Sequence, residues 1–115
     1  MTTNAPNSDG MDAMDMLETL TFKVDRRRRT GGGQWVSGTI AGHEFEALVF
    51  PEPAENPDWE VNGDSRISKL WLQRISDKAE VYNWDRGEDR QPATDVASQI
   101  VDLLAAGLAE AVFGS

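Results

Sequence analysis

Apolar and polar residues alternate in several short stretches over the first two thirds of the chain. Between residues 17 and 25, Leu20, Phe22 and Val24 fall on one side of an extended backbone and most other side chains are polar. This period of two predicts a strand, because successive side chains of a strand point to opposite faces. Residues 26–33 follow, with four arginines, one threonine and three glycines. They predict a mobile hairpin loop, since like charges repel and glycine is costly to order.

Two further hairpins are expected. Residues 34–40 and 43–50 predict strands joined by a two-residue turn at Ala41 and Gly42. Residues 66–75 and 79–84 predict a second pair of strands. Between the hairpins, residues 51–64 contain three prolines and five carboxylates. This composition predicts a long irregular connection, which we expect Trp59 and Val61 to fix to the domain.

After Pro92 the apolar period changes from two to 3.6, which predicts an amphipathic helix. Thr94 or Asp95 suits its N-cap and Gly114 suits its end. The residues that return to one face are Val96, Ile100, Leu103, Leu104, Leu108 and Ala111. The predicted fold class is therefore α+β, a twisted antiparallel sheet of about five strands with one C-terminal helix packed on one face.

The first 16 residues show no apolar period and are rich in small and acidic residues. Such a composition cannot bury enough apolar surface to offset the entropy of ordering. We expect residues 1–16 to form a disordered acidic tail, in which Met11, Met14 and Met16 have no core role. Residues 17–115 are expected to form a single α+β domain.

Charge and cysteine content narrow the classes of function. The 115 residues include 20 acidic and 11 basic side chains and no cysteine, giving a net charge of −9. The absence of cysteine excludes disulfides and thiolate chemistry and fits a cytoplasmic location. Neither a signal peptide nor a membrane span is expected. The negative charge argues against a generic binder of phosphate backbones. A local basic patch can still attract phosphate over short distances, because salt screens the more distant acidic groups.

Candidate chemistry is sparse. His43 is the one histidine of the chain, and on a strand it faces away from Glu44 and Glu46, so a surface histidine beside a turn is expected. Glu44, Glu46 and Asp85 offer oxygen ligands for Mg²⁺ or Ca²⁺ without the spacing of a known loop. The glycine run after the arginines lacks the lysine and Ser/Thr of a phosphate-binding loop. We therefore expect no enzyme activity, no metal and no cofactor.

Partner contacts are the remaining class. The chain is rich in large rings for its size, and Trp71 lies between Leu70 and Leu72, so the three cannot share one sheet face. Either both faces are covered or an aromatic patch is exposed, and exposed patches mark interfaces. Asp85 is expected to bridge Arg66 or Arg86 at a turn. The partner-binding residues predicted here are Arg26, Arg27, Arg28, Arg29, Trp59, Trp71, Tyr82 and Trp84.

Four blocks of sequence resemble a domain of unknown function from tailed phages and bacteria. They are residues 35–45 (WVSGTIAGHEF), 50–53 (FPEP), 66–72 (RISKLWL) and 81–87 (VYNWDRG). The resemblance spans roughly residues 34–105 and implies a phage or mobile-element origin without any assigned activity. This chain departs from the pattern at Trp84, at Glu88 and at residues 64–65, where the pattern has tyrosine, tryptophan and a glycine.

The leading hypothesis is a non-enzymatic protein-interaction module with an unidentified protein partner. One alternative is a nucleic-acid accessory protein that uses the arginines at 26–29, and another is an acidic mimic of DNA, motivated by the charge of −9. A homodimer through the small residues of the helix or through sheet edges is a further option.

Overall fold

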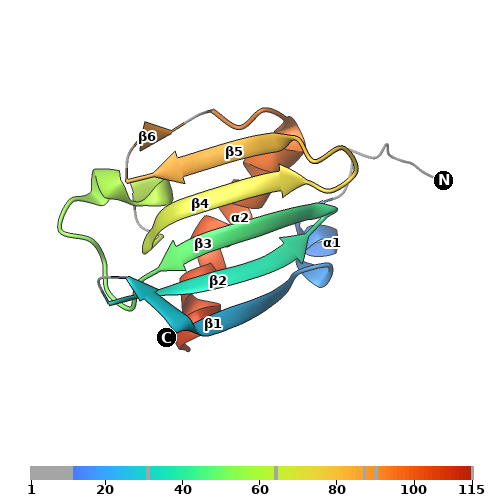
Figure 1. The fold of residues 1–115 in the computed structure, drawn as a ribbon. Helices are drawn as coiled ribbons and strands as arrows, with labels where there is room; N and C mark the ends of the chain where they lie inside the picture. Colours follow the sequence, from blue (N-terminus) through green and yellow to red (C-terminus); the bar gives the residue numbers. More distant parts are fainter. Residues whose placement is uncertain (1–11, 31, 64, 87, 90, 115) are drawn as a thin grey trace.

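The computed structural model describes residues 12–30, 32–63, 65–86, 88–89 and 91–114. Six strands form one antiparallel sheet in the order β1-β2-β3-β4-β5-β6. The long helix α2 crosses one face of this sheet and leaves the other face open (Figure 1). The predicted α+β class, with a sheet and a C-terminal helix on one face, is confirmed.

The bounds of the elements follow the sequence patterns closely after residue 33. The helices and strands are α1 (Ala13–Glu18), β1 (Thr21–Thr30), β2 (Gly33–Ile40), β3 (His43–Val49), β4 (Ile67–Arg74), β5 (Glu80–Asp85), β6 (Glu88–Asp89) and α2 (Asp95–Phe113), with short 3-10 helices η2 (Pro57–Trp59) and η3 (Val61–Gly63) between β3 and β4. Both expected hairpins are present. The two-residue strand β6 was not predicted, because two residues are too few to show a period.

Tight turns and one glycine set the register of the first hairpins. Ala41 and Gly42 have φ angles of 49° and 76°, as a two-residue turn with both central residues in the left-handed region requires. Gly38 pairs with Phe22 on β1 and Phe45 on β3. A Cβ atom at Gly38 would lie 2.1 Å from the carbonyl oxygen of Thr21, so no larger residue fits there without a shift of the strands.

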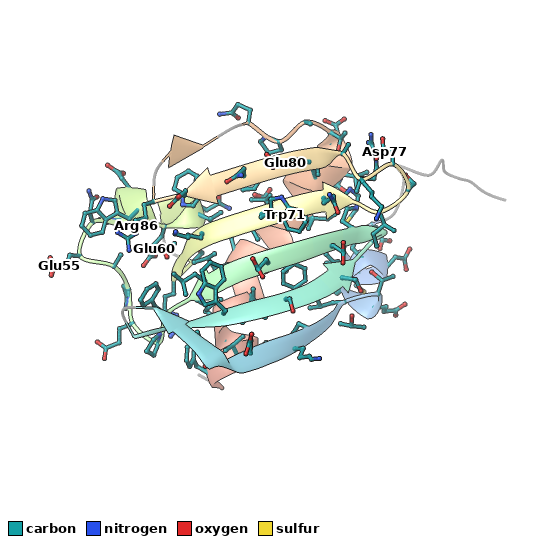
Figure 2. The ribbon with its side chains drawn as sticks, viewed as in Figure 1. Glu55, Glu60, Trp71, Asp77, Glu80 and Arg86 are labelled. Carbon is teal, nitrogen blue, oxygen red and sulfur yellow. The ribbon has the colours of Figure 1, made fainter. Side chains whose placement is uncertain are left out.

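Alternation along the strands divides the sheet into a helix-side face and an open face. Leu70 and Leu72 lie on the helix-side face and are buried, whereas Trp71 between them lies on the open face and is half-buried. Figure 2 shows Trp71 on the side of the sheet away from α2. The core also includes Val36, Ile40, Phe45, Ala47, Ile67, Ile100, Leu104 and Leu108.

The helix α2 begins and ends where the sequence indicates. The side chain of Thr94 accepts a hydrogen bond from the amide of Ala97 at 3.0 Å, and Gly114 ends the helix at a φ of 76°. By length and composition alone α2 could cross a membrane, a test that core helices of soluble domains also pass. Its buried residues pack on the sheet.

The prediction of a mobile hairpin loop at residues 26–33 is wrong. β1 continues through the four arginines to Thr30, with a register shift between Asp25 and Arg29 where β1 pairs with β2. The strand persists because the backbone of Arg29 and Thr30 still pairs with Gln34 and Gly33. β1 is an outermost strand, and natural sheets commonly carry charged residues on such edges because they discourage pairing with another sheet.

The expectation that Met16 lies in a disordered tail is also wrong. Met16 belongs to α1, is fully buried and joins the core cluster. The side chain of Asp12 caps this helix by accepting from the amide of Asp15 at 2.9 Å. The hydroxyl of Thr19 accepts from the amide of Ala41 at 2.8 Å, which ties α1 to the β2–β3 turn. Met14 is 74% exposed, as expected, and residues 1–11 lie outside the described part.

Candidate functional site

The connection between β3 and β4 and the end of β5 enclose a cleft at one end of the sheet. Its volume is about 410 Å³. We call it the loop cleft, and it is lined by Phe50, Glu52, Pro53, Ala54, Glu55, Trp59, Glu60, Arg66, Ser68 and Arg86. Figure 2 shows Glu55, Glu60 and Arg86 at this end, opposite the end that carries Asp77. Three of the four sequence blocks that carry the family resemblance therefore meet here.

A buried carboxylate holds the connection together. Glu60 is 2% exposed. One of its oxygens accepts from the amide of Ala54, and the other accepts from the amide of Arg66 at 3.0 Å. A buried carboxylate needs hydrogen-bond donors to replace water, and the two backbone amides supply them. The same side chain thereby links two segments of the connection. Val61, fully buried beside Glu60, fixes the connection to the core as the sequence predicts.

Two arginines reach the cleft from residues with left-handed backbone. Arg66 has a φ of 63° and Arg86 a φ of 52°. Such conformations cost free energy in residues other than glycine and often occur at functional sites. The guanidinium of Arg66 donates to the carbonyl of Pro51 at 2.6 Å. Arg86 is exposed, and its guanidinium has no hydrogen-bond or ion-pair partner among the described residues.

Ser68 lies at a bulge in β4. Leu48 pairs with Lys69 and Val49 with Ile67, so Ser68 is the extra residue of the strand. Its side chain is 7% exposed, and its Oγ is buried without a hydrogen-bond partner in the described structure. A buried hydroxyl of this kind carries an uncompensated desolvation cost.

Trp59 forms an exposed part of the cleft wall. It is 45% exposed, and its carbonyl accepts from the indole Nε1 of Trp84 at 3.0 Å. Trp59 ends the short helix η2, and the side chain of Asn56 caps the start of η2 by accepting a hydrogen bond from the amide of Asp58 at 3.0 Å. These two hydrogen bonds hold the backbone around Trp59, so its exposed indole would lose little conformational entropy if it contacted another molecule.

The predicted partner-binding residues do not share one surface. Trp59 lines the loop cleft, and its carbonyl accepts from the indole of Trp84, which itself lies outside the cleft lining. Trp71 lies on the open face beside a shallow depression that Trp35, Glu46 and Trp84 also line. Tyr82 is only 4% exposed and belongs to the core, because its pairing with Leu72 turns it toward α2, so it offers almost no surface to a partner in this structure. The backbone of residues 26–29 lies in β1, on the far side of the sheet from β5, and the side chains there are outside the described part.

His43 is buried instead of lying at the surface. It is 5% exposed because β3 pairs with β2 and β4 on either side, and it shares the helix-side face with Phe45. Its Nδ1 donates to the carbonyl of Ala41 at 2.8 Å, which leaves Nε2 buried without a partner in the described structure. Glu44 and Glu46 point the other way, as expected. Within the described ranges, no group of three or more His, Asp or Glu residues is arranged to hold a metal ion.

Two ion pairs between described residues lie outside the cleft. Arg74 and Asp77 pair at 2.8 Å at the β4–β5 turn, and the hydrogen bond from Arg74 lowers the pKa of the Asp77 carboxyl to about 2. Asp85 pairs with Lys69 across the strands at 3.7 Å. The expected bridge from Asp85 to Arg66 or Arg86 is therefore not formed, since Asp85 shares the open face with Lys69.

Sequence reasoning missed Glu60 and Ser68. Glu60 is one of five carboxylates between residues 51 and 64, and nothing in that composition distinguishes a buried glutamate from a solvated one. Ser68 occupies a strand position whose role depends on a bulge. Arg66 and Arg86 were noticed as turn residues, and a positive φ at arginine has no sequence signature.

Comparison with known protein families finds a match over most of the sheet and helix. The family model of a domain of unknown function, DUF7678, matches residues 34–109. No curated protein and no solved structure matches the chain. The matched region contains the whole loop cleft and starts after the arginines of β1. The chain thus belongs to the DUF7678 family.

Proposed function

We propose that the chain is a non-enzymatic protein-interaction module that binds a segment of a protein partner in the loop cleft. The observation that carries this proposal is Trp59, an indole 45% exposed on the wall of a cleft of about 410 Å³. Tryptophan and arginine are the residues that most often dominate binding energy at protein interfaces, and Arg86 lines the same cleft.

The construction of the cleft supports binding in preference to a purely structural role. Glu60, Arg66 and the Trp84 indole fix its walls through hydrogen bonds to backbone groups. A wall that is already ordered loses little conformational entropy when a ligand enters. The cleft also lies entirely in the region that the family model matches, so its walls come from the family domain itself.

Capture of partners from extract of the source cells tests the proposal. The tagged full chain is compared with Trp59→Ala and with Ile75→Ala, which removes a similarly exposed apolar side chain, 47% exposed, at the opposite end of the sheet. We expect the Ile75 variant to retain partners of the unmodified chain that Trp59→Ala loses. An identical set of captured proteins for both variants, with both folded by circular dichroism, would contradict the proposal.

Because four sequence blocks resemble a domain found in phages and bacteria, we propose that the chain has a phage or mobile-element origin. Because the chain has no cysteine, we propose that it acts in the cytoplasm. A homodimer is kept as a proposal for which the oligomeric state in solution is the test.

Nucleic-acid binding by residues 26–29 has one structural observation in its favour. The arginine block lies on an edge strand, so a ligand can approach it without crossing the sheet. Such binding would weaken steeply with salt and disappear when all four arginines become serine. The acidic-mimic alternative requires a contiguous acidic face. On the open face, Lys23 and Lys69 are interspersed with the carboxylates, which counts against it.

A further inference from the structure

Two donors that line the loop cleft, the guanidinium of Arg86 and the hydroxyl of Ser68, have no side-chain partner among the described residues. Arg86 is exposed and lines the cleft, and Ser68 lines the same cleft with its Oγ buried. The two residues are held together by the hydrogen bond from the Arg86 amide to the Ser68 carbonyl at 2.9 Å. The other charged groups of the inner wall are engaged: Glu60 accepts two amides, and Arg66 donates to Pro51.

We propose that the loop cleft binds a carboxylate of the partner segment, with the Arg86 guanidinium as its fork and the Ser68 hydroxyl as a further donor. The inference rests on the proposed function and names the group that is recognised. An arginine matches both oxygens of a carboxylate, and hydrogen bonds between charged groups are roughly twice as strong as neutral ones. The bound carboxylate also gives Ser68 the partner that it lacks.

The charges of the cleft favour a single negative charge over other ligands. A phosphate with two charges would face the rim carboxylates Glu52 and Glu55 and a chain of net charge −9, with only one unpaired arginine among the described cleft residues to balance it. A cation would find no unbonded carboxylate on the inner wall that the structure describes, because Glu60 is occupied and Glu55 projects outward at the tip of the connection in Figure 2.

The apolar wall fits the carbon skeleton that carries the carboxylate. Phe50, Pro53 and Trp59 line the same cleft and offer ring and aliphatic surface. Either a C-terminal carboxylate or the side chain of a partner's Glu or Asp supplies this chemistry, so the experiment carries one probe for each source.

The test uses amide chemical shifts of the isotopically labelled full chain. Three probes are titrated: N-acetyl-leucine with its terminal carboxylate, N-acetylglutamic acid α-amide with a side-chain carboxylate, and the neutral N-acetyl-leucinamide. We expect at least one carboxylate probe to shift the amides of Ser68 and Arg86, and the probe that binds identifies the source. The neutral probe should bind at least about tenfold more weakly, as expected for the loss of a charge-assisted pair.

Variants separate recognition from folding. Arg86→Gln replaces the guanidinium with a shorter, uncharged amide that still donates hydrogen bonds, and it should weaken binding of the carboxylate probe at least about tenfold. Lys23→Gln removes one positive charge from the open face and should leave the affinity unchanged. Ser68→Ala should weaken the probe several-fold while the melting temperature of the free protein stays the same or rises, because the buried hydroxyl has no partner to lose.

Equal binding of neutral and charged probes, unchanged affinity in Arg86→Gln, or no shifts at the cleft would each overturn the inference. Its failure is distinguishable from that of the proposed function. If Trp59→Ala loses the partner but no carboxylate probe binds, the module stands and the carboxylate is wrong. If a probe binds through Arg86 but Trp59→Ala captures the same proteins as the unmodified chain, the cleft is a carboxylate site for a small molecule and the proposed protein-binding function is wrong.

Discussion

The amide of Arg86 donates a hydrogen bond of 2.9 Å to the carbonyl of Ser68. This bond joins the end of β5 to the bulge of β4 and holds the two residues that carry the unpartnered donors next to each other. Neither residue has a side-chain partner in the described structure. The cleft is thus organised before any ligand arrives, and its stability depends on groups that can be changed one at a time.

Glu60 should stabilise the cleft more than any exposed carboxylate near it. Glu60→Gln replaces an acceptor oxygen with an amino group, which leaves one buried backbone N–H unpaired and should cost about 1–3 kcal/mol of unfolding free energy. Urea denaturation measures the loss, and hydrogen exchange at Ala54 and Arg66 should accelerate. Glu55→Gln, on an exposed residue, is the control and should change neither; equal effects of the two substitutions would argue against the buried role.

Two glycines should respond to alanine in opposite directions. At Gly38 a Cβ would lie 2.1 Å from the Thr21 carbonyl oxygen and 2.9 Å from the Phe45 ring, so Gly38→Ala should lower the unfolding free energy by at least about 1–3 kcal/mol. Gly107 lies in α2, and a Cβ added there would have nothing within 4 Å, so Gly107→Ala should raise stability by about 0.5–1 kcal/mol. Thermal denaturation of both variants checks the pair, and a neutral Gly38→Ala would mean that β1 and β2 are less closely paired.

Met16 should be a core residue and Met14 should not. Met16→Ala removes a fully buried side chain and should cost about 2–5 kcal/mol, whereas Met14→Ala, at a residue 74% exposed, should stay within about 0.5 kcal/mol of the unmodified chain. Chemical denaturation distinguishes them. Similar small effects at both positions would show that α1 does not belong to the folded domain.

The ion pair at the β4–β5 turn predicts an acid-dependent contribution. The hydrogen bond from Arg74 lowers the pKa of Asp77 from 3.8 to about 2. A carboxyl with a lowered folded-state pKa stabilises fully above its unfolded value and loses that contribution as the pH falls through 3.8 toward 2. The effect should be small because both side chains are exposed to solvent.

An NMR titration of the Asp77 carboxyl measures that shift directly. Arg74→Gln should return the pKa toward 3.8, and Asp77→Asn should remove part of the loss of stability between about pH 4 and pH 2 that the unmodified chain shows. An Asp77 that titrates at 3.8 in the unmodified chain would contradict the pairing.

The sheet and helix were largely predictable because their residues repeat a period. Leu70 and Leu72 alternate with Trp71 and are buried, as the period of two predicts. In the helix, Ile100, Leu104 and Leu108 of the predicted stripe are buried, whereas Ala111 is exposed and the buried face instead includes Ala97, Val101 and Ala109. The arginine block was mispredicted because local repulsion was judged without the β2 partner that pairs with it. Met16 was missed because a helix of six residues is too short to show a period in a polar stretch.

The candidate site was much less predictable. Trp59 was expected to fix the connection and to contact a partner, but its neighbours in the cleft come from three separate segments whose meeting is a matter of tertiary structure. Ser68 depends on a one-residue bulge and Arg86 on a backbone angle of 52°. None of these three features is associated with a particular residue type or spacing, so none can be recognised in the sequence.

The connection between β3 and β4 contributes Val61 to the core, and its remaining residues in η2 and η3 are not buried in the sheet–helix packing. Substitutions at exposed residues of this connection, such as Glu52 and Glu55, would change the cleft while Glu60, Val61 and the scaffold beneath kept the stability of the fold. The shape of the cleft and the stability of the fold therefore depend on largely separate residues, so the surface at this end of the sheet can change in sequence without a change of the sheet–helix scaffold.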